Sequence, residues 1–169
     1  MITDGIEVVK LTDQTLLQEA CNTTMRKGSS NISLRDIYKC EHSPIRTQIF
    51  WIRMFDIPSF VSVHFVRHKI GVEHFVQTNR EDRGGEPDAG RWSLVNHGML
   101  INAQALIQIA RKRLCNQSHT ETIKTMLNIK TAIAEVDPFL CGFLVPECIY
   151  RNGYCPELKP CREQPTWRG

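Results

Sequence analysis

The stretch RTQIFWIRMFDI, residues 46–57, constrains the fold of this chain more than any other segment. Successive side chains of a strand point to opposite faces of its sheet. Here both faces are apolar: Phe50, Ile52 and Met54 lie on one, and Ile49, Trp51 and Phe55 on the other. A strand of this kind is typical of a sheet that is covered on both sides. The sequence therefore predicts a strand in the middle of a covered sheet.

The remaining pattern predicts one more strand and several helices. The strand covers residues 5–11, and residues 80–91 form a polar loop rich in Gly and Pro. The first two expected helices are one that follows Thr12 as its N-cap and one over 33–42 that stops near Pro44. A third runs from Ser59 to Ile70 after Pro58, and a fourth from Leu100 to Arg113. The last begins at a capping box of Ser118 and Glu121 and ends at Asp137-Pro138. We expect one α+β domain over residues 1–169, with a small antiparallel or mixed sheet and a Cys-rich tail at 141–161.

Composition narrows the possible functions. A chain of 169 residues with 41% apolar and 23% charged residues is long enough to bury one core. The net charge of +3 is too small to indicate a partner such as a nucleic-acid polymer. Neither a signal peptide nor an apolar run of membrane-spanning length is visible. We therefore expect a cytoplasmic protein that does not bind membranes.

The seven cysteines raise the question of a metal. An odd number without a secretory signal argues against a disulfide framework. Cys141, Cys148, Cys155 and Cys161 crowd into the tail, but none forms a CxxC pair, so their spacing is weak support for zinc. The alternatives are a Cys₄ site and a compact, proline-braced tail whose cysteines bind no metal.

One predicted helix carries positive charge within an apolar frame. His64, Arg67 and His68 stand at i, i+3 and i+4, so they share one face of the predicted helix. A cation in apolar surroundings requires an anionic partner, and phosphate is a natural one. The alternative is an ordinary basic helix edge whose histidines are hydrogen-bonded in the core. Asn102 and Arg113, eleven residues apart on another predicted helix, would also share a face and could address one ligand.

The order of these residues resembles the flavin-dependent thymidylate synthases, the ThyX family. Arg67-His68-Lys69 is similar to that family's Arg-His-Arg signature, and residues 40–69 resemble the segment that leads into it. NAQALIQIARKRLCNQSHTE resembles the family's helix pattern, and PECIYRNGYCPELKPC its Cys-rich tail. The resemblance implies a ThyX-like fold, a homotetramer, FAD as cofactor, and NADPH and methylenetetrahydrofolate as co-substrates. It implies transfer of a one-carbon unit to C5 of a pyrimidine deoxynucleotide monophosphate, dUMP to dTMP.

The resemblance also assigns residues. Those implied to bind FAD are His42, Ser43, Arg67, His68, Lys69, Asn102, Gln104 and Gln108. Those implied to bind the nucleotide are His64, Gln77, Thr78, Arg80 and Arg113. Arg113 would also be catalytic, because it would stabilise negative charge developing on the uracil carbonyls.

Several positions depart from the family pattern. Lys69 and Gln104 replace arginines, and a lysine lacks the planar fork that holds phosphate in a bidentate manner. Without an insertion, Val72, Phe75, Gln77 and Asn79 stand at the remaining signature positions; one inserted residue, which we prefer, instead brings Thr78 and Arg80 into register with its serine and arginine. The loop at 81–91 stands where the family has an extra helical segment with a phosphate-binding arginine, so Arg83 or Arg91 would have to substitute. These departures leave two alternatives open: another C5 modification (hydroxymethylation or hydroxylation of dUMP or dCMP), or a relative that binds nucleotide or flavin without catalysis.

Overall fold

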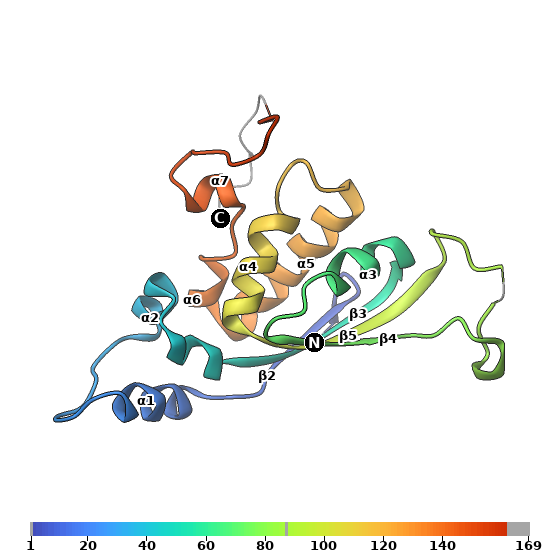
Figure 1. Ribbon diagram of the computed structural model, residues 1–169. Coiled ribbons are helices and arrows are strands. Elements are labelled where there is room, and N and C mark those ends of the chain that lie inside the picture. The colour runs from blue at the N-terminus through green and yellow to red at the C-terminus, as the bar shows by residue number, and fades with distance from the viewer. Residues whose placement is uncertain (1, 87, 162–169) are drawn as a thin grey trace.

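Five antiparallel strands form one sheet in this computed structural model, which describes residues 2–86 and 88–161 (Figure 1). The strands in spatial order are β1 (Ile2–Thr3), β2 (Ile6–Lys10), β3 (Ile49–Pro58), β5 (Leu94–Asn102) and β4 (Val72–Val76). Asp4 and Gly5 join β1 to β2 with φ values of 47° and 74°. This Asp-Gly pair is favoured in tight hairpins because its backbone twist matches that of the strands.

The sheet is covered on one face, so the expectation of cover on both faces is wrong for the described chain. Phe50, Ile52 and Met54 of β3 are fully buried. On the opposite face, Phe75 and Leu100 remain 56% and 37% exposed. Helices α3, α4 and α5 lie on the first face, whereas α1 lies beyond one end of the sheet (Figure 1). The apolar side chains of the second face have no layer above them in residues 2–86 and 88–161.

The helices are short except for one. They are α1 (Gln14–Thr23), α2 (Leu34–Cys40), α3 (Ser59–Val66), α4 (Ala103–Arg113), α5 (Thr120–Val136), α6 (Pro138–Cys141) and α7 (Glu147–Tyr150), with 3₁₀ turns η1 (Ser43–Thr47) and η2 (Glu81–Arg83). Two predicted caps are wrong by one residue. Asp13 caps α1, because Thr12 instead donates to the Thr47 carbonyl at 2.7 Å, and the His119 side chain, not that of Ser118, caps α5.

Helix α3 ends four residues before the predicted boundary. Val66 is its last residue, and Gly71 adopts a left-handed φ of 75° just before β4 begins. Gly adopts this conformation without strain, and the chain there turns back into the sheet. Arg67, His68 and Lys69 therefore lie on a loop, and the predicted helix face shared with His64 is not formed.

The predicted helix at 100–113 is a strand for its first three residues. Leu100 to Asn102 complete β5, where Ile101 pairs with both Phe50 and Val72. Asn102 then caps α4, accepting a hydrogen bond of 2.9 Å from the Ala105 amide. Asn102 and Arg113 consequently stand at opposite ends of α4, about 16 Å apart at 1.5 Å per residue. They do not share a helix face as expected.

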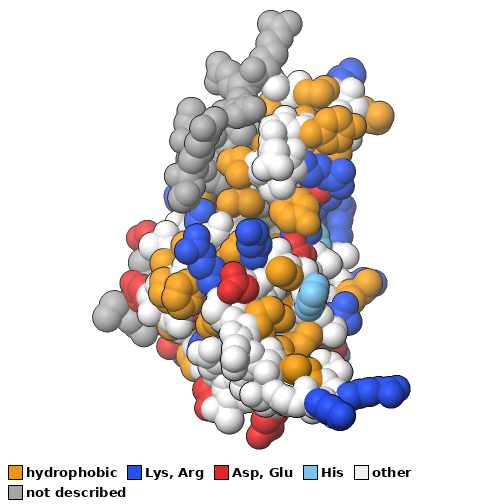
Figure 2. Space-filling view, turned by 90° about the vertical axis from the view of Figure 1, so that its left-hand side faces the viewer, with side chains coloured by type: hydrophobic (Ala, Val, Ile, Leu, Met, Phe, Trp, Pro, Cys, Tyr) orange, Lys and Arg blue, Asp and Glu red, His pale blue; other side chains and the backbone are white. Residues whose placement is uncertain are grey.

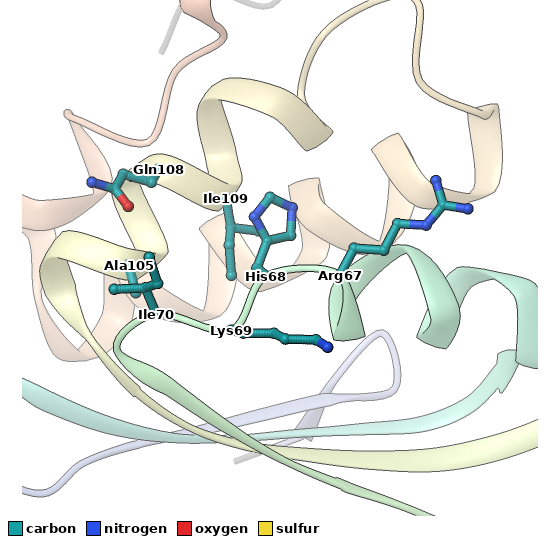
Figure 3. Close-up of a pocket in the computed structure, with 7 residues that line it drawn as sticks. All are labelled: Arg67, His68, Lys69, Ile70, Ala105, Gln108 and Ile109. Carbon is teal, nitrogen blue, oxygen red and sulfur yellow. The ribbon is translucent and has the colours of Figure 1, made fainter.

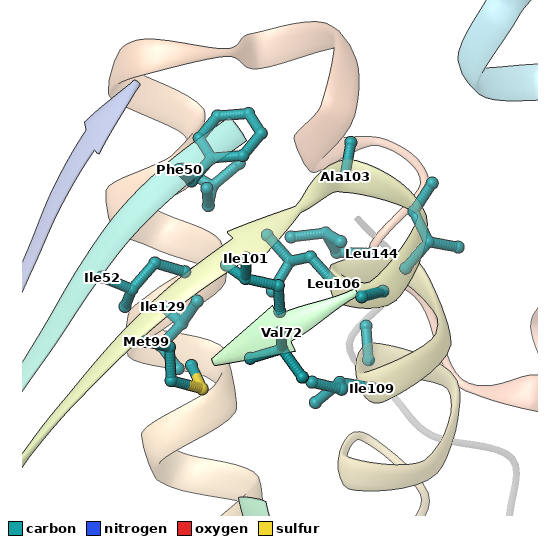
Figure 4. Close-up of a cluster of buried hydrophobic side chains, with 14 of the residues drawn as sticks. Phe50, Ile52, Val72, Met99, Ile101, Ala103, Leu106, Ile109, Ile129 and Leu144 are labelled. Carbon is teal, nitrogen blue, oxygen red and sulfur yellow. The ribbon is translucent and has the colours of Figure 1, made fainter. Parts of the chain in front are cut away.

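The core lies between the covered face and the helices. Ile52 and Met99 of the sheet pack with Leu106 and Ile109 of α4 and with Ile129 of α5 (Figure 4). All of them are at most 1% exposed. This packing fixes the position of α4, whose N-terminus and C-terminus flank the loop that carries Arg67.

A buried carboxylate ties the far end of α5 to the sheet. Asp137 accepts hydrogen bonds from Lys10 Nζ at 2.7 Å and from Tyr38 Oη at 2.6 Å. Its other oxygen accepts from the Leu140 amide at 3.0 Å and so caps α6. Burial, together with the hydrogen bond to Asp137, raises the pKa of Tyr38. Asp137 therefore links β2, α2 and the α5–α6 corner.

The surface does not concentrate one sign of charge on the face that carries α1 and α2. Figure 2 shows basic, acidic and apolar side chains interspersed there. Among the helices of the described part, none combines the length and the apolar character that crossing a bilayer requires.

Candidate functional site

The loop from Arg67 to Gly71 lies between two cavities. The first, of about 310 Å³, lies between the loop and α4 (Figure 3); it is lined by Arg67, His68, Lys69, Ile70, Ala105, Gln108 and Ile109. The second, of about 400 Å³, lies against α3 and β4; its lining includes Ser62, Arg67, Lys69, Gln77 and Asn79. Both cavities share Arg67 and Lys69, so these two cations can reach a ligand on either side of the loop.

The cations around this loop differ from other cations of the described chain in their partners. Elsewhere Arg111 pairs with Glu41 and Lys10 with Asp137. In contrast, no residue within 2–86 and 88–161 forms an ion pair with Arg67, Lys69, Arg91 or Arg113. Arg113 is half-buried, and an unneutralised cation in such a position is costly, so an anionic ligand would offset that cost, whereas Arg67, Lys69 and Arg91 are exposed and open to a ligand.

His68 is a neutral member of the loop. Burial, with the nearby charges of Arg113 and His74, lowers its pKa to about 4. Arg113 Nε donates to His68 Nε2 at 3.1 Å, so the ring accepts through Nε2 and carries its proton on Nδ1. The Arg-His-Lys triplet therefore presents two cations near neutral pH, with an imidazole that orients Arg113.

Positive charge converges on His64 at the end of α3. Burial and then the charges of Arg113, Arg67, His119 and Arg91 lower the pKa of His64. Burial and the charge of Arg67 also lower the pKa of Arg113. His64 is held by Thr122 of α5, whose Oγ1 lies 2.8 Å from Nδ1. The region between α3, α4 and the start of α5 is thus electropositive.

An aromatic cluster closes one side of this region. The Phe60 ring packs against Trp92 and His119 at centroid distances of 4.9 and 4.6 Å, and the Arg91 guanidinium lies 4.8 Å from the same ring. The Phe60 amide donates to the Arg91 carbonyl at 3.2 Å, so the end of the β4–β5 loop is attached to α3. Arg91 is therefore held near the site.

The architecture matches solved structures of a known enzyme. Two crystal structures of thymidylate synthase X from Helicobacter pylori, both with FAD and dUMP, superpose with a TM-score of 0.65 and 12% identity. They cover 83% and 82% of this chain and 99% of their own. The fold is that of ThyX. No protein-family model matches the sequence, and no curated protein matches it. At this identity the likeness shows the fold alone.

Some residues assigned by the resemblance to ThyX meet at the loop and others do not. Arg67, His68, Lys69 and Gln108 line one cavity, and Arg113 contacts His68. Gln77 lines the second cavity and accepts from the Asn96 amide at 2.9 Å. Arg80 instead pairs with Asp82 at 2.8 Å, and Thr78 caps the same turn by accepting from the Arg80 amide. Gln104 donates to Glu41 at 2.6 Å.

His42 and Ser43 line a different cavity. It holds about 350 Å³ and lies among α1, α2 and η1, with Cys21 and Ile37 in its wall. Asn102 lies closer to the loop than His42 and Ser43 do. A Cβ added to Gly71 would be 2.5 Å from the side-chain amide nitrogen of Asn102. Only Gly leaves room for this approach of the loop to α4.

The tail does not present the four cysteines that were weak candidates for zinc, Cys141, Cys148, Cys155 and Cys161, as a ligand set. No three His, Cys, Asp or Glu side chains of residues 2–86 and 88–161 are placed to hold a metal ion. Burial raises the pKa of Cys141, where Lys130 is the neighbouring charge. Burial also raises the pKa of Cys148, and Cys155 and Cys161 lie near it. Cys141 is therefore in a different electrostatic environment from Cys148.

Three histidines near the loop were not assigned by sequence. His119 caps α5, whereas His74 on β4 and His97 on β5 face each other at 2.9 Å. Burial and then the charge of His74 lower the pKa of His97 to about 4, and the residue is 1% exposed. The alternation of Val95, His97, Met99 and Ile101 is the signal that could have placed His97 on the covered face, had the strand been recognised.

The lowered pKa values of His68 and His97 predict that acid destabilises the fold at pH values above the range in which carboxylates titrate. Between pH 6.5 and about 4 the unfolded chain binds protons at His68 and His97 that the folded chain does not. The free energy of unfolding should therefore fall as the pH falls through that window. His97 contributes at most about 1.4 kcal/mol per pH unit. Urea unfolding midpoints at about pH 7, 6 and 5 measure this; midpoints that stay level would contradict it, and His97→Gln should flatten the dependence.

Proposed function

We propose that this protein is an FAD-dependent enzyme that transfers a one-carbon unit to C5 of dUMP, a thymidylate synthase of the ThyX type. The observation that carries the proposal is the convergence of Arg67, Lys69, Arg91 and Arg113, none paired with a carboxylate of the described chain, on one loop of a ThyX fold. Phosphate groups are the ligands that such a cluster binds best.

The nucleotide would lie against the electropositive region between α3 and α4. Arg113 is oriented by His68 at 3.1 Å, so its guanidinium can address the pyrimidine carbonyls while Arg67 or Arg91 meets the phosphate. Negative charge developing on the uracil carbonyl oxygens would activate C5 as the nucleophile, and a preorganised guanidinium would stabilise that charge. The residues proposed for the nucleotide are His64, Gln77, Thr78, Arg80 and Arg113; Arg80 would exchange Asp82 for the ligand.

The hydrogen-bond donors of the loop suit FAD, but one cavity alone is too small to hold it. The residues proposed for FAD are His42, Ser43, Arg67, His68, Lys69, Asn102, Gln104 and Gln108. When bound, FAD would supply the redox chemistry of the reaction, with NADPH as reductant and methylenetetrahydrofolate as one-carbon donor. Cavities of 310 and 350 Å³ are at the lower end of the ~300–1,000 Å³ that drug-sized ligands occupy. A dinucleotide therefore requires more than one of them.

This separation supports a composite site in a homo-oligomer, which we propose to be a tetramer. His42 and Ser43 line a different cavity from Arg67 to Lys69, so a second copy could bring the two sets together. The uncovered sheet face offers Phe75 and Leu100 for contact between copies. Light scattering after size exclusion gives the oligomeric state, and a monomer that still binds FAD would exclude the composite site.

A second candidate is another modification at C5, hydroxymethylation or hydroxylation of dUMP or dCMP. It is favoured by two features of the flavin side. Gln104, where the resemblance expects an arginine, has its amide bonded to Glu41, and Lys69 offers a point charge in place of a planar fork. Both changes alter how a flavin would be held without removing the cations for the nucleotide.

One assay decides among these functions. The absorbance spectrum of the purified protein is first examined for flavin. The protein is then incubated with dUMP or dCMP, NADPH and methylenetetrahydrofolate, and the mass of the nucleotide product is measured by mass spectrometry. A methyl gain on dUMP supports the proposal, whereas a hydroxyl or hydroxymethyl gain, or reaction with dCMP alone, supports the second candidate. Nucleotide binding without flavin or product would indicate a non-catalytic relative.

A further inference from the structure

A continuous series of hydrogen bonds leads from α3 to the backbone of the loop from Arg67 to Gly71, which we call the cationic loop. Ser62 Oγ of α3 lies 3.0 Å from His97 Nδ1, and His97 Nε2 lies 2.9 Å from His74 Nδ1. His74 Nε2 then lies 2.7 Å from the backbone carbonyl oxygen of His68. Ser62 and His97 are buried at 2% and 1% exposure. We call Ser62, His97 and His74 the histidine chain.

The last contact sets the direction of every bond in the histidine chain. A carbonyl oxygen accepts only, so His74 Nε2 must carry a proton. A neutral His74 then accepts at Nδ1, which requires a proton on His97 Nε2. The lowered pKa of His97 keeps that ring neutral, so its Nδ1 accepts from the Ser62 hydroxyl. When both rings are neutral, each is therefore the Nε2–H tautomer.

The histidine chain ends where a proton cannot be passed on. A backbone carbonyl has no proton to release, so the chain does not connect the interior to a reacting group. Its effect is structural: the hydrogen bond from His74 Nε2 fixes the position of the His68 carbonyl. The same loop is held at its other end by the Asn102 amide, which donates to the Gly71 carbonyl at 3.0 Å, and at the His68 ring by Arg113.

The loop needs such anchors because its charges repel. Arg67 lowers the pKa of Arg113, which shows that the two guanidiniums disfavour each other. Lys69 adds a third cation with no acidic partner in the described chain. Without a fixed backbone between them, Arg67 and Lys69 would separate, and an anion would have to reassemble the site at the expense of affinity.

We propose that Ser62, His97 and His74 are positioning residues which hold the His68 carbonyl and thereby preorganise Arg67, His68 and Lys69 for a phosphate-bearing ligand. The inference rests on the proposed function only in taking this loop as the anion-binding loop. It concerns residues on α3, β4 and β5 that do not themselves line the cavity between the loop and α4.

The ligand-free protein tests the geometry of the histidine chain. In ¹⁵N-histidine-labelled protein near pH 7, NMR of the ring nitrogens should show a proton on Nε2 of His74. His74→Asn should remove the signals of one ring and alter those of His97. A proton on Nδ1 of neutral His74 would overturn the proposal, because the bond to the His68 carbonyl would then be absent.

Three substitutions of His74 test its effect on binding. Glutamine places an N–H near histidine Nε2 and can still donate to the His68 carbonyl, whereas asparagine reaches only the Nδ1 position, and leucine offers neither. With inorganic pyrophosphate as the probe in calorimetry, His74→Asn and His74→Leu should each raise Kd about tenfold, the effect of one lost hydrogen bond. His74→Gln should stay near the wild-type value, and Thr131→Ala, at an exposed position of α5 that lines neither cavity beside the loop, is the control.

The outcomes separate this inference from the proposed function. Equal Kd values for His74→Gln and His74→Asn would overturn the positioning role, even in a protein that converts dUMP. Wild-type protein that binds no pyrophosphate would overturn it too, because the loop would not be an anion site. The Gln-over-Asn order in a protein that makes no nucleotide product would support the inference and reject the enzyme.

Discussion

Replacing Arg113 with glutamine is expected to lower kcat/KM for dUMP by about 10²–10³-fold, the usual cost of removing one preorganised donor at a developing oxyanion. The reason lies in its placement: its Nε is fixed on His68 at 3.1 Å, and it has no acidic partner in the described chain. Steady-state kinetics with saturating NADPH and methylenetetrahydrofolate measure the effect.

Stability distinguishes this loss from a folding defect. Arg67 lowers the pKa of Arg113, so removing the guanidinium relieves repulsion, and the unfolding midpoint should stay level or rise. Lys112→Gln is the matched control, since that neighbour points to Glu157 of the tail at 3.7 Å and should leave kcat/KM unchanged. Equal losses in the two variants would remove the special role of Arg113.

Asp137→Ala should cost the fold about 3–5 kcal/mol, the range for breaking a buried ion pair from one side. The substitution leaves Lys10 without its carboxylate, takes the acceptor from the buried Tyr38 hydroxyl and uncaps α6. Asp137→Asn preserves the shape and the cap but not the charge, so it should cost less. Urea unfolding followed by circular dichroism gives both values.

The matched control is the ion pair between Glu7 and Arg53 on the uncovered face. Arg53 is 46% exposed there, and pairs of this kind contribute about 0–1 kcal/mol. Glu7→Gln should therefore shift the midpoint little. If Asp137→Ala shifted it no further than Glu7→Gln, the link between β2, α2 and α6 would not be an important support of the fold.

Local sequence predicted the elements whose signals are strong and missed those that depend on distant contacts. The strand at 46–57 and the long helix that ends at Asp137 were predicted because their periods are regular. The strand at 94–102 was read partly as helix, because a short apolar run fits either structure and His97 interrupts its apolar alternation. Its true partners, Phe50 and Val72, are far away in the chain.

The sequence predicted the cations of the site but not the contacts that hold them in place. The order Arg67-His68-Lys69 and the position of Arg113 identified the cations. Nothing local indicated that the loop would be held by His74, or that Arg91 rather than Arg80 would be attached near it, because those contacts join separate segments. Cover on only one face of the sheet was likewise invisible, since apolar side chains on the second face look the same whether their cover comes from this chain or from another copy.

The strand order carries a kinetic consequence. Val8 pairs with Ile52, and Ile52 pairs with Met99, so both neighbours of the central strand come from remote parts of the chain. Large loops must close before either ladder yields its hydrogen bonds, whereas α4 and α5 need only local contacts. The helices should therefore form before the sheet during refolding, and the cationic loop, whose anchors lie on β4 and β5, should assemble among the last parts of the molecule.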